Sequence, residues 1–571
     1  MPSIELHFID YVIFFLYMIL ILGLGVGLAV WKKKATTRDY FLAGDQLPWY
    51  AIGASILASN ISTEHFIGMM GWAYVYGFVV AHFEWGAWLT WSIALWMFLP
   101  FYMRTRVFTI PEFIEKRFNR ASRVLLSIAS LVTYVTALEA GVLYAGAKML
   151  DASFGLPLAW GVVILGVATG MYAIFGGLLS VVWTDFVQCL LFIFGGGMVT
   201  ILGLREIGGL GQLMTDMPDK FYIYHLSHDK CPIAGYYICC IFVGAYYMSS
   251  NQFMMQRCLG ARTQWDGRMG LLFSNYLKLL MPLIVVIPGI IAARLFPNLE
   301  DPDQAYPILV SKLLGPGMLG LLLAALAAAM MSTVSSALNS ASTLLTMDLF
   351  APWARLKDDD PRLVGYGKWF STLLLVVGIV LGIGYSRLTD PVTGAPYPVF
   401  SLIMNIFFFI GPPLSIVFLA GILWARATGA AAVWTMVTGY FWALFSQYYV
   451  FTPYDSLPQW VRNVFLPTSA LIDFKQWVDG TTLATDFNNF LYVATWNGAF
   501  SLIVMIVVSL LTKPKPREQI AHLLWTPSVM RIDADATGKG GSTRSLVFWW
   551  IGVMLLTAML YAYFGWFQLT H

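Results

Sequence analysis

Ser59-Asn60-Ile61-Ser62-Thr63-Glu64-His65 is a polar run inside an apolar stretch, and its flanks, 47–58 and 66–73, have the composition of membrane-embedded helix. A carboxylate and an imidazole at that depth are costly unless they face protein, water or an ion. A membrane-spanning helix tolerates such a break only where the backbone is buried in protein or lines a cavity. The run therefore predicts one half of a transport site.

The whole chain has the composition of a membrane protein. Of its 571 residues 58% are apolar and 11% are charged, whereas a soluble chain of this length would divide into domains with charged surfaces. We expect about 14 apolar spans, each of the length that crosses a bilayer. No catalytic set, metal-ligand spacing or nucleic-acid-binding patch occurs between them, so we expect neither an enzyme nor a nucleic-acid partner.

Basic residues predict the orientation in the membrane. Lys and Arg gather in alternate loops, namely 32–38, 104–123, 257–268, 355–362, 426 and 513–544. Loops rich in Lys and Arg stay in the cytoplasm, which places both termini on the extracytoplasmic side. The first apolar run, 11–31, is too long for a signal-peptide core and is expected to remain as an anchor in the plasma or bacterial inner membrane.

A second interrupted helix follows the first by roughly five spans. Within the apolar segment 234–256, Gly244 and Ser249-Ser250-Asn251-Gln252 form the interruption. Two broken helices at corresponding positions are typical of inverted-repeat transporters with a site at the membrane midplane. We therefore expect an all-α single transmembrane domain with a five-plus-five inverted-repeat core. Its repeats would be 47–204 and 234–424, with an extra helix in 9–31 and three more in 430–571.

Hydroxyl side chains cluster in the segment 323–340. Small residues there allow close helix packing, and that interpretation remains open for any single hydroxyl. The cluster as a whole offers hard oxygen ligands of the kind that suit a sodium ion. Its members are Ser332, Thr333, Ser335, Ser336 and Asn339.

Four further ionisable residues lie in apolar surroundings. Glu84 and Asp185 stand near predicted helix ends, where a solvated position or a helix cap competes with a functional role. Lys278 is too deep to extend to the membrane surface and is expected to have an internal partner. For Glu139 the sequence nominates no partner.

Several motifs resemble the solute:sodium symporter family, and within it the sodium/glucose cotransporter branch. They are the run 176–188, the break at 60–62, the hydroxyl-rich segment that ends in Thr346-Met347-Asp348, and the short runs 41–44, 83–85 and 109–113. The resemblance covers about residues 38–425. It implies a LeuT-type core, about fourteen helices and transport by alternating access.

The resemblance also implies two groups of ion-binding residues. The family's sodium site would fall on the backbone carbonyls of Ala58, Ile61 and Ala329 and the hydroxyls of Ser332 and Thr333. A second sodium site, or the path by which sodium leaves, would involve Asp185 and Ser336. Sodium would be the coupling ion, with no other cofactor, and replacement of sodium by protons stays open.

A sugar site follows from the same resemblance. It would comprise Asn60, His65, Glu84 and Lys278, with Tyr247 closing the inner side and Met69 and Phe83 on the outer side. The chain departs from sugar-transporting relatives at Met248, where they place Trp, and at Met404, where they place Gln. A lost amide leaves substrate hydroxyls without a partner, at about 1–3 kcal/mol each.

Together these residues predict a sodium-coupled symporter that imports a neutral sugar or polyol, such as glucose or galactose, across a lipid bilayer. Other substrates stay open, among them a modified sugar, inositol or a carboxylate. A sugar-gated sensor that binds without accumulating its ligand also stays open. No obligate protein partner is evident.

Overall fold

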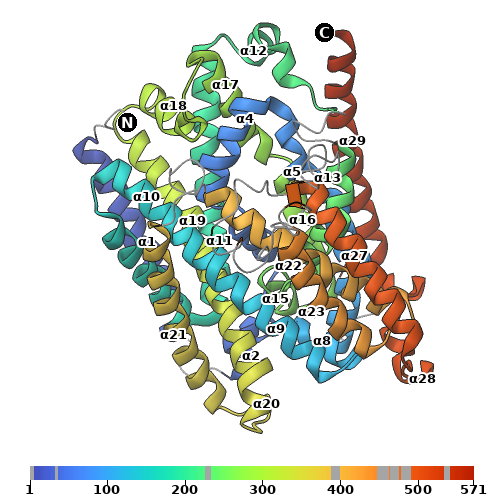
Figure 1. Ribbon diagram of the computed structural model, residues 1–571. Helices are drawn as coiled ribbons and strands as arrows, with labels where there is room; N and C mark the ends of the chain where they lie inside the picture. The colour runs from blue at the N-terminus through green and yellow to red at the C-terminus, as the bar shows by residue number, and fades with distance from the viewer. Residues whose placement is uncertain are drawn as a thin grey trace.

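The computed structural model describes residues 6–31, 36–225, 233–387, 399–446, 490–532 and 541–571, with a few isolated residues between 459 and 476. These residues form helices and connecting segments, with no β-strand among them. In Figure 1, α1 (Phe8–Trp31) and α21 (Arg362–Tyr385) lie at one side of the bundle and α29 (Thr543–Thr570) at the other. The helices between them form the core that holds the site.

Ten helical runs in the described part of the chain are long and apolar enough to cross a membrane. The predicted all-α membrane fold is thereby confirmed, while the count of about 14 spans stays a prediction. Besides those already named, the helices that matter below are α3 (Trp49–Asn60), α4 (Met70–Tyr76), α8 (Ile110–Arg117), α9 (Arg120–Thr133), α11 (Leu158–Glu206), α14 (Ala245–Ser249), α15 (Gln252–Leu259), α16 (Gln264–Lys278), α19 (Met318–Thr343), α22 (Val399–Leu423), α23 (Gly429–Phe445) and α27 (Phe490–Leu511).

α11 contains two spans joined by a sharp bend. Its 49 residues include Gly177 with φ 58° and ψ −157°, a conformation that only glycine adopts without strain. In a straight helix Tyr172 and Thr184 would lie about 18 Å apart, yet both contact Gly25 on α1. The single long run thus accounts for two of the predicted spans.

The first predicted break is present. α3 ends at Asn60, Ile61 is extended with φ −95° and ψ 122°, and helix resumes after Ser62 with a π-helical turn, His65–Met69, before α4. α3 packs against α11, α15, α16 and α19, so the backbone of the break is buried in protein. The arrangement meets the requirement that non-helical backbone at membrane depth be buried in protein.

The second predicted break is present as well. α14 ends at Ser249, Asn251 is extended with φ −87° and ψ 122°, and α15 begins at Gln252. A parallel bridge between Leu47 and Ala261 joins the start of α3 to the end of α15, and in it the Leu47 amide donates to the Gly260 carbonyl at 3.1 Å. The two broken helices are therefore neighbours.

Three arginines assigned to basic loops are buried instead, which corrects that part of the charge pattern. Arg117, Arg257 and Arg268 are at most 1% exposed. Arg117 donates to the carbonyls of Gly421, Trp424 and Ala427, at the end of α22, at 2.6–3.2 Å. Helix C-terminal carbonyls carry partial negative charge and lack helical partners, so they can neutralise a buried guanidinium.

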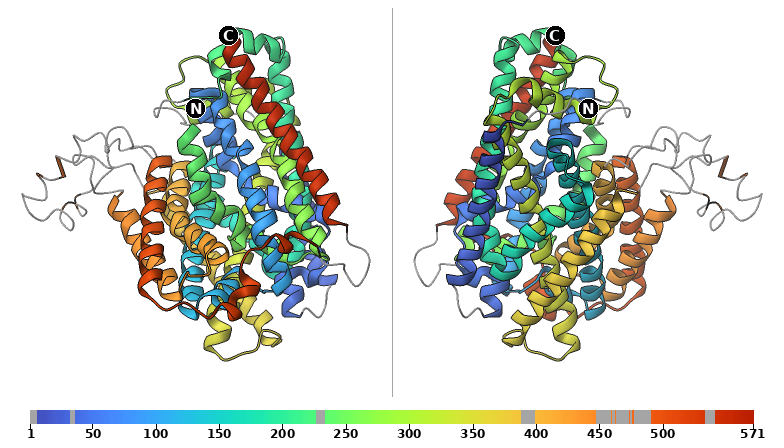
Figure 2. Two further views of the ribbon diagram at one scale, coloured as in Figure 1. Left: turned by 90° about the vertical axis from the view of Figure 1, so that its right-hand side faces the viewer. Right: turned by 90° about the vertical axis from the view of Figure 1, so that its left-hand side faces the viewer.

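Both termini lie toward one end of the bundle, whereas α8, α20 (Ala351–Trp353) and α28 (Arg517–Ile520) lie toward the opposite end (Figures 1 and 2). The lower end of the molecule in these views thus carries the segments that flank the basic loops. The described helices α23, α27 and α29 come after the core in the chain and lie at its periphery.

Candidate ion and substrate sites

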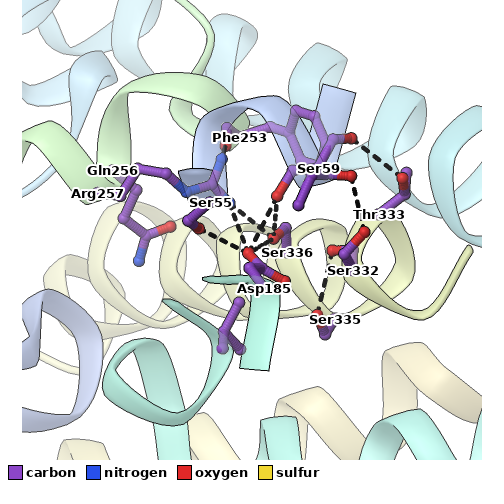
Figure 3. Close-up of polar contacts among 12 residues, drawn as sticks. Ser55, Ser59, Asp185, Phe253, Gln256, Arg257, Ser332, Thr333, Ser335 and Ser336 are labelled. Atoms are coloured by element: carbon purple, nitrogen blue, oxygen red, sulfur yellow. Dashed lines mark hydrogen bonds and ion pairs between the residues drawn. The ribbon is translucent and has the colours of Figure 1, made fainter. Parts of the chain in front are cut away.

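The broken end of α3 faces the hydroxyl cluster of α19 (Figure 3). The Ser332 hydroxyl lies 2.7 Å from the Ala58 carbonyl oxygen and 2.9 Å from that of Ala329. The Thr333 hydroxyl lies 3.0 Å from the Ser59 carbonyl and 3.2 Å from that of Ala329. Five uncharged oxygens thus converge between two helices, a ligand set that suits a hard monovalent cation.

Four of the five residues expected to hold sodium lie in this cluster. Among the described contacts, no hydrogen bond joins Ile61 to either hydroxyl, and the carbonyl that Thr333 meets belongs to Ser59. The reason is local: α3 stays helical through Asn60, and the Ile61 amide still donates to the Leu57 carbonyl at 3.0 Å. The sequence located the break without fixing the residue at which the helix ends.

Asp185 lies inside α11 and not at a helix end, so the competing interpretation as a helix cap is wrong. Its Oδ2 accepts hydrogen bonds from Ser55 at 2.6 Å, Ser59 at 3.2 Å and Ser336 at 3.3 Å (Figure 3). The Arg257 guanidinium donates to Ser336 at 2.6 Å and lies 4.0 Å from Asp185. The expected pair of Asp185 and Ser336 is thus present, together with a buried arginine that the sequence placed elsewhere.

A cavity of about 150 Å³ opens beside the first break. One water molecule needs about 10–15 Å³ of such volume, so the cavity has room for about ten waters. This is the size of a small organic solute. It is lined by Asn60, Glu64, His65, Met69, Phe83, Glu84, Ala87, Thr90, Tyr236, Cys239, Cys240, Val243, Gly244, Tyr247, Met248, Lys278, Phe407 and Phe408. All the predicted substrate residues are among these except Met404, whose side chain lies outside the described part.

The polar end of the cavity is an ion pair with an imidazole beside it. Lys278 Nζ lies 3.0 Å from Glu84 Oε2, which gives the lysine the internal partner that was expected and removes the solvated position considered for Glu84. His65 Nε2 lies 3.6 Å from Glu84 Oε1. Both charged residues are 2% exposed, so their pairing is what makes them tolerable at this depth.

Tyr247 closes the cavity next to the break. Its hydroxyl accepts a hydrogen bond from Asn60 Nδ2 at 3.1 Å, and its ring packs edge-on against Phe407 at 4.8 Å. Met248 lines the cavity beside it, where a relative would present a ring. Tyr247 is thereby tied to the same helix break that presents the Ala58 and Ser59 carbonyls to α19.

The sequence missed part of the lining. Glu64, Tyr236, Phe407 and Phe408 face the cavity, and none was nominated for it. Glu64 belongs to the polar run of the first break, so a signal was present, but its direction depends on the π-helical turn that follows. The aromatic residues carry no local signal, because aromatic side chains are common throughout membrane helices.

Glu139 lies away from this site. It is fully buried in the π-helical segment Tyr134–Gly141, packs against Gly378 on α21, and neither carboxylate oxygen has a hydrogen-bond partner in the described structure. Neither the sequence nor the described structure thus identifies a partner for Glu139.

The architecture, two broken helices with an oxygen cluster and a cavity at the breaks, is that of a secondary transporter. The family model of the sodium:solute symporter family matches residues 40–439. The chain belongs to this family, and the resemblance noted in its motifs is confirmed.

Named cotransporters are similar to this chain over most of its length. It is 33% identical to a sodium/glucose cotransporter of Vibrio parahaemolyticus over 78% of this chain and 87% of the relative. It is 30% identical to sodium/myo-inositol cotransporter 2 of Oryctolagus cuniculus, over 90% and 78% of the two chains. It is 28% identical to sodium/glucose cotransporter 1 of the same species, over 92% and 83%.

The fold is shared with a solved transporter. A Na⁺-coupled sialic acid symporter in a substrate-bound, outward-open state aligns with a TM-score of 0.74 over 89% of this chain and 99% of that chain, at 20% identity. The likeness at this identity concerns the fold.

Proposed function

We propose that this protein is a sodium-driven symporter for a neutral sugar or polyol. One observation carries the proposal: the helix break at Ile61 presents carbonyl oxygens to the α19 hydroxyls on one side and Asn60 and His65 to the cavity on the other. The named relatives, which are sodium/glucose and sodium/myo-inositol cotransporters, support the same ion and substrate class.

Sodium would bind among the carbonyls of Ala58 and Ala329 and the hydroxyls of Ser332 and Thr333. Each of the two hydroxyls already lies 2.7–3.2 Å from at least one of these carbonyl oxygens, so an ion would replace these hydrogen bonds with coordination. An ion there holds α3 against α19 and fixes the break. It thereby orients Asn60 and His65 for the substrate, which is a coupling free energy between two sites.

The sugar would bind between the Glu84–Lys278 pair and Tyr247. Carboxylate and ammonium groups bind hydroxyls through charge-assisted hydrogen bonds, and the apolar lining packs on the ring. Moving one sodium down 100 mV supplies about 2.3 kcal/mol. That amount supports roughly 40-fold accumulation of the substrate per sodium.

The protein would act in the plasma membrane, or in the inner membrane of a bacterium, with both termini on the extracytoplasmic side. The position of α8, α20 and α28 at the end opposite the termini supports this orientation, because the basic loops then face the cytoplasm. The transport cycle needs sodium and no other cofactor, and involves no chemical conversion of the substrate.

Uptake into proteoliposomes tests the proposal. We expect radiolabelled glucose, galactose or myo-inositol to accumulate under an inward sodium gradient with negative interior, and to equilibrate without accumulation when choline replaces sodium. Substrate-induced sodium current without substrate uptake would identify a sensor instead and would refute symport. A panel containing sialic acid and an amino acid checks the substrate class.

A further inference from the structure

We propose that Glu64 is a further substrate-binding residue, whose carboxylate accepts a hydrogen bond from one hydroxyl of the sugar and selects substrates that carry a donor at that position. The proposal rests on the proposed function, since it concerns the same cavity. It adds a residue that neither the motif resemblance nor the Glu84–Lys278 pair accounts for.

The Glu64 side chain is buried, points to the cavity and is incompletely satisfied. It lines the cavity, its side chain is 8% exposed, and Oε2 makes no hydrogen bond. Its polar neighbours are the Ser62 hydroxyl, which comes close without hydrogen-bond geometry, and His65 Nδ1, 3.8 Å from Oε1. A buried carboxylate oxygen without a donor is costly, so a donor that enters the cavity is favoured there.

His65 cannot neutralise Glu64. The Ser62 backbone amide donates to His65 Nδ1 at 3.3 Å, and a backbone amide has no lone pair to accept in return. Nδ1 is therefore an acceptor without a proton, and the single imidazole proton lies on Nε2, directed at Glu84. The imidazole is uncharged in this arrangement.

One carboxylate of the cavity lining has no cation paired with it in the described structure. Its charged lining residues are Glu64, Glu84 and Lys278, and the lysine lies on Glu84 at 3.0 Å. Glu64 is thus the carboxylate left for the substrate. A sugar that fills the cavity beside Glu64 therefore has to offer this carboxylate a donor or lose affinity.

The place of Glu64 in the chain links this contact to sodium. It stands between the extended Ile61 and the π-helical turn His65–Met69, in the segment whose geometry depends on the packing of α3 against α19. Sodium binding that fixes the break also fixes the direction of this carboxylate. The contact is therefore expected to form only in the sodium-bound protein.

A series of monodeoxy sugars tests the proposal against wild type, Glu64→Gln and Glu64→Asp. Affinity is measured as the concentration that half-inhibits sodium-driven uptake of the parent sugar. In wild type we expect one hydroxyl whose removal weakens binding about 10- to 100-fold through loss of a hydrogen bond to a charged group. Glu64→Gln keeps only a neutral acceptor, so it should bind the parent sugar more weakly than wild type does and lose less affinity when that hydroxyl is removed. Glu64→Asp, which keeps the charge, should retain part of the preference.

Glu139→Gln is the matched control, because Glu139 is a buried glutamate on another helix and does not line the cavity. It should show the wild-type dependence on every hydroxyl. The proposal is overturned if Glu64→Gln binds the parent sugar like wild type, or if its loss multiplies with that of every deoxy position. If wild type accumulates no sugar at all, it is the proposed function that fails. A sodium-induced thermal shift in each variant confirms that the protein is folded.

Discussion

The two helix breaks have nearly the same backbone and different surroundings. Ile61 and Asn251 are both extended, with φ −95° and −87° and the same ψ of 122°. At the second break the Asn251 side chain accepts from the Phe253 amide at 3.1 Å and from the Tyr134 hydroxyl, and although Asn251 Nδ2 has no hydrogen-bond partner, Asn251 does not line the cavity. At the first break Asn60 Oδ1 and Glu64 Oε2 have no hydrogen-bond partner, and both residues line the cavity.

The difference shows what a helix break can be used for. Where the protein supplies the partners, as at Asn251, the break is a capped helix start that fixes α15. Where residues with unpartnered polar atoms line a cavity, as at the first break, the break is open to a ligand. Two breaks with one geometry thus have different expected roles, and mutations should separate them.

The largest effect is expected from Ser332→Ala. Removal of this hydroxyl takes one ligand from the proposed ion site and leaves the Ala58 carbonyl without its present donor. Sodium-driven uptake should fall to the level seen in choline. Ser342→Ala on the same helix is the control, because its hydroxyl binds the Gly367 carbonyl at 2.8 Å, away from the break. Unchanged sodium dependence in Ser332→Ala would contradict the ion site.

The next effect concerns the polar end of the cavity. Lys278→Met leaves Glu84 buried without its cation, which costs about 3–5 kcal/mol. Sugar affinity, measured by calorimetric titration, should fall by at least about 100-fold, and the melting temperature should drop. The double variant Glu84→Gln/Lys278→Met removes both charges and should recover stability without recovering binding. Intact sugar binding in either variant would remove the pair from the site.

At the second break a smaller effect of another kind is expected. Asn251→Ala removes the side-chain cap of α15 and should lower the free energy of unfolding by about 1–2 kcal/mol. The sodium concentration that half-saturates uptake should stay as in wild type. Thermal unfolding and uptake measured on one preparation separate the two quantities. A large rise in the half-saturating sodium concentration would show that both breaks serve the ion.

Sequence reasoning located both breaks because polar residues at membrane depth carry a strong local signal. It did not find the arginine that lies beside Asp185. Arg257 follows the second break near a predicted helix end and was read as a loop charge, whereas tertiary packing places it 4.0 Å from Asp185. That contact joins α11 to α15, and nothing local in either segment encodes it.

Details of the site depended on where helices end. Extension of α3 through Asn60 brought the Ser59 carbonyl to Thr333, two residues earlier than the Ile61 carbonyl that the resemblance implied. The π-helical turn after Glu64 brought this carboxylate into the cavity lining. Shifts of one residue change which groups share a face, and patterns of composition do not resolve them.

The smallest effect is expected at Asp303, which contacts α4, the helix that follows the first break. Asp303 packs on Gly71 of α4, and burial, aided by Asp301 and opposed by Lys148, raises its pKa to about 6. The folded state then binds the Asp303 proton more strongly than the unfolded state does. Stability should therefore be highest below about pH 4 for this group and fall by about 1 kcal/mol as the pH rises through about 6.

Asp303→Asn removes this dependence. Thermal unfolding of the variant between pH 4 and 7 should lack the wild-type slope in that interval. An identical slope in both proteins would assign the titration to another group.

The central claim is that one helix break couples the ion to the sugar, and reciprocal titration tests it most directly. Sugar affinity of the purified protein is measured at several sodium concentrations, and sodium affinity at several sugar concentrations. Because coupling is reciprocal, sodium should strengthen sugar binding by the same factor by which sugar strengthens sodium binding, about 5- to 150-fold for coupling of 1–3 kcal/mol. In Ser332→Ala this factor should fall to one. Sugar binding of equal strength with and without sodium in wild type would contradict the account.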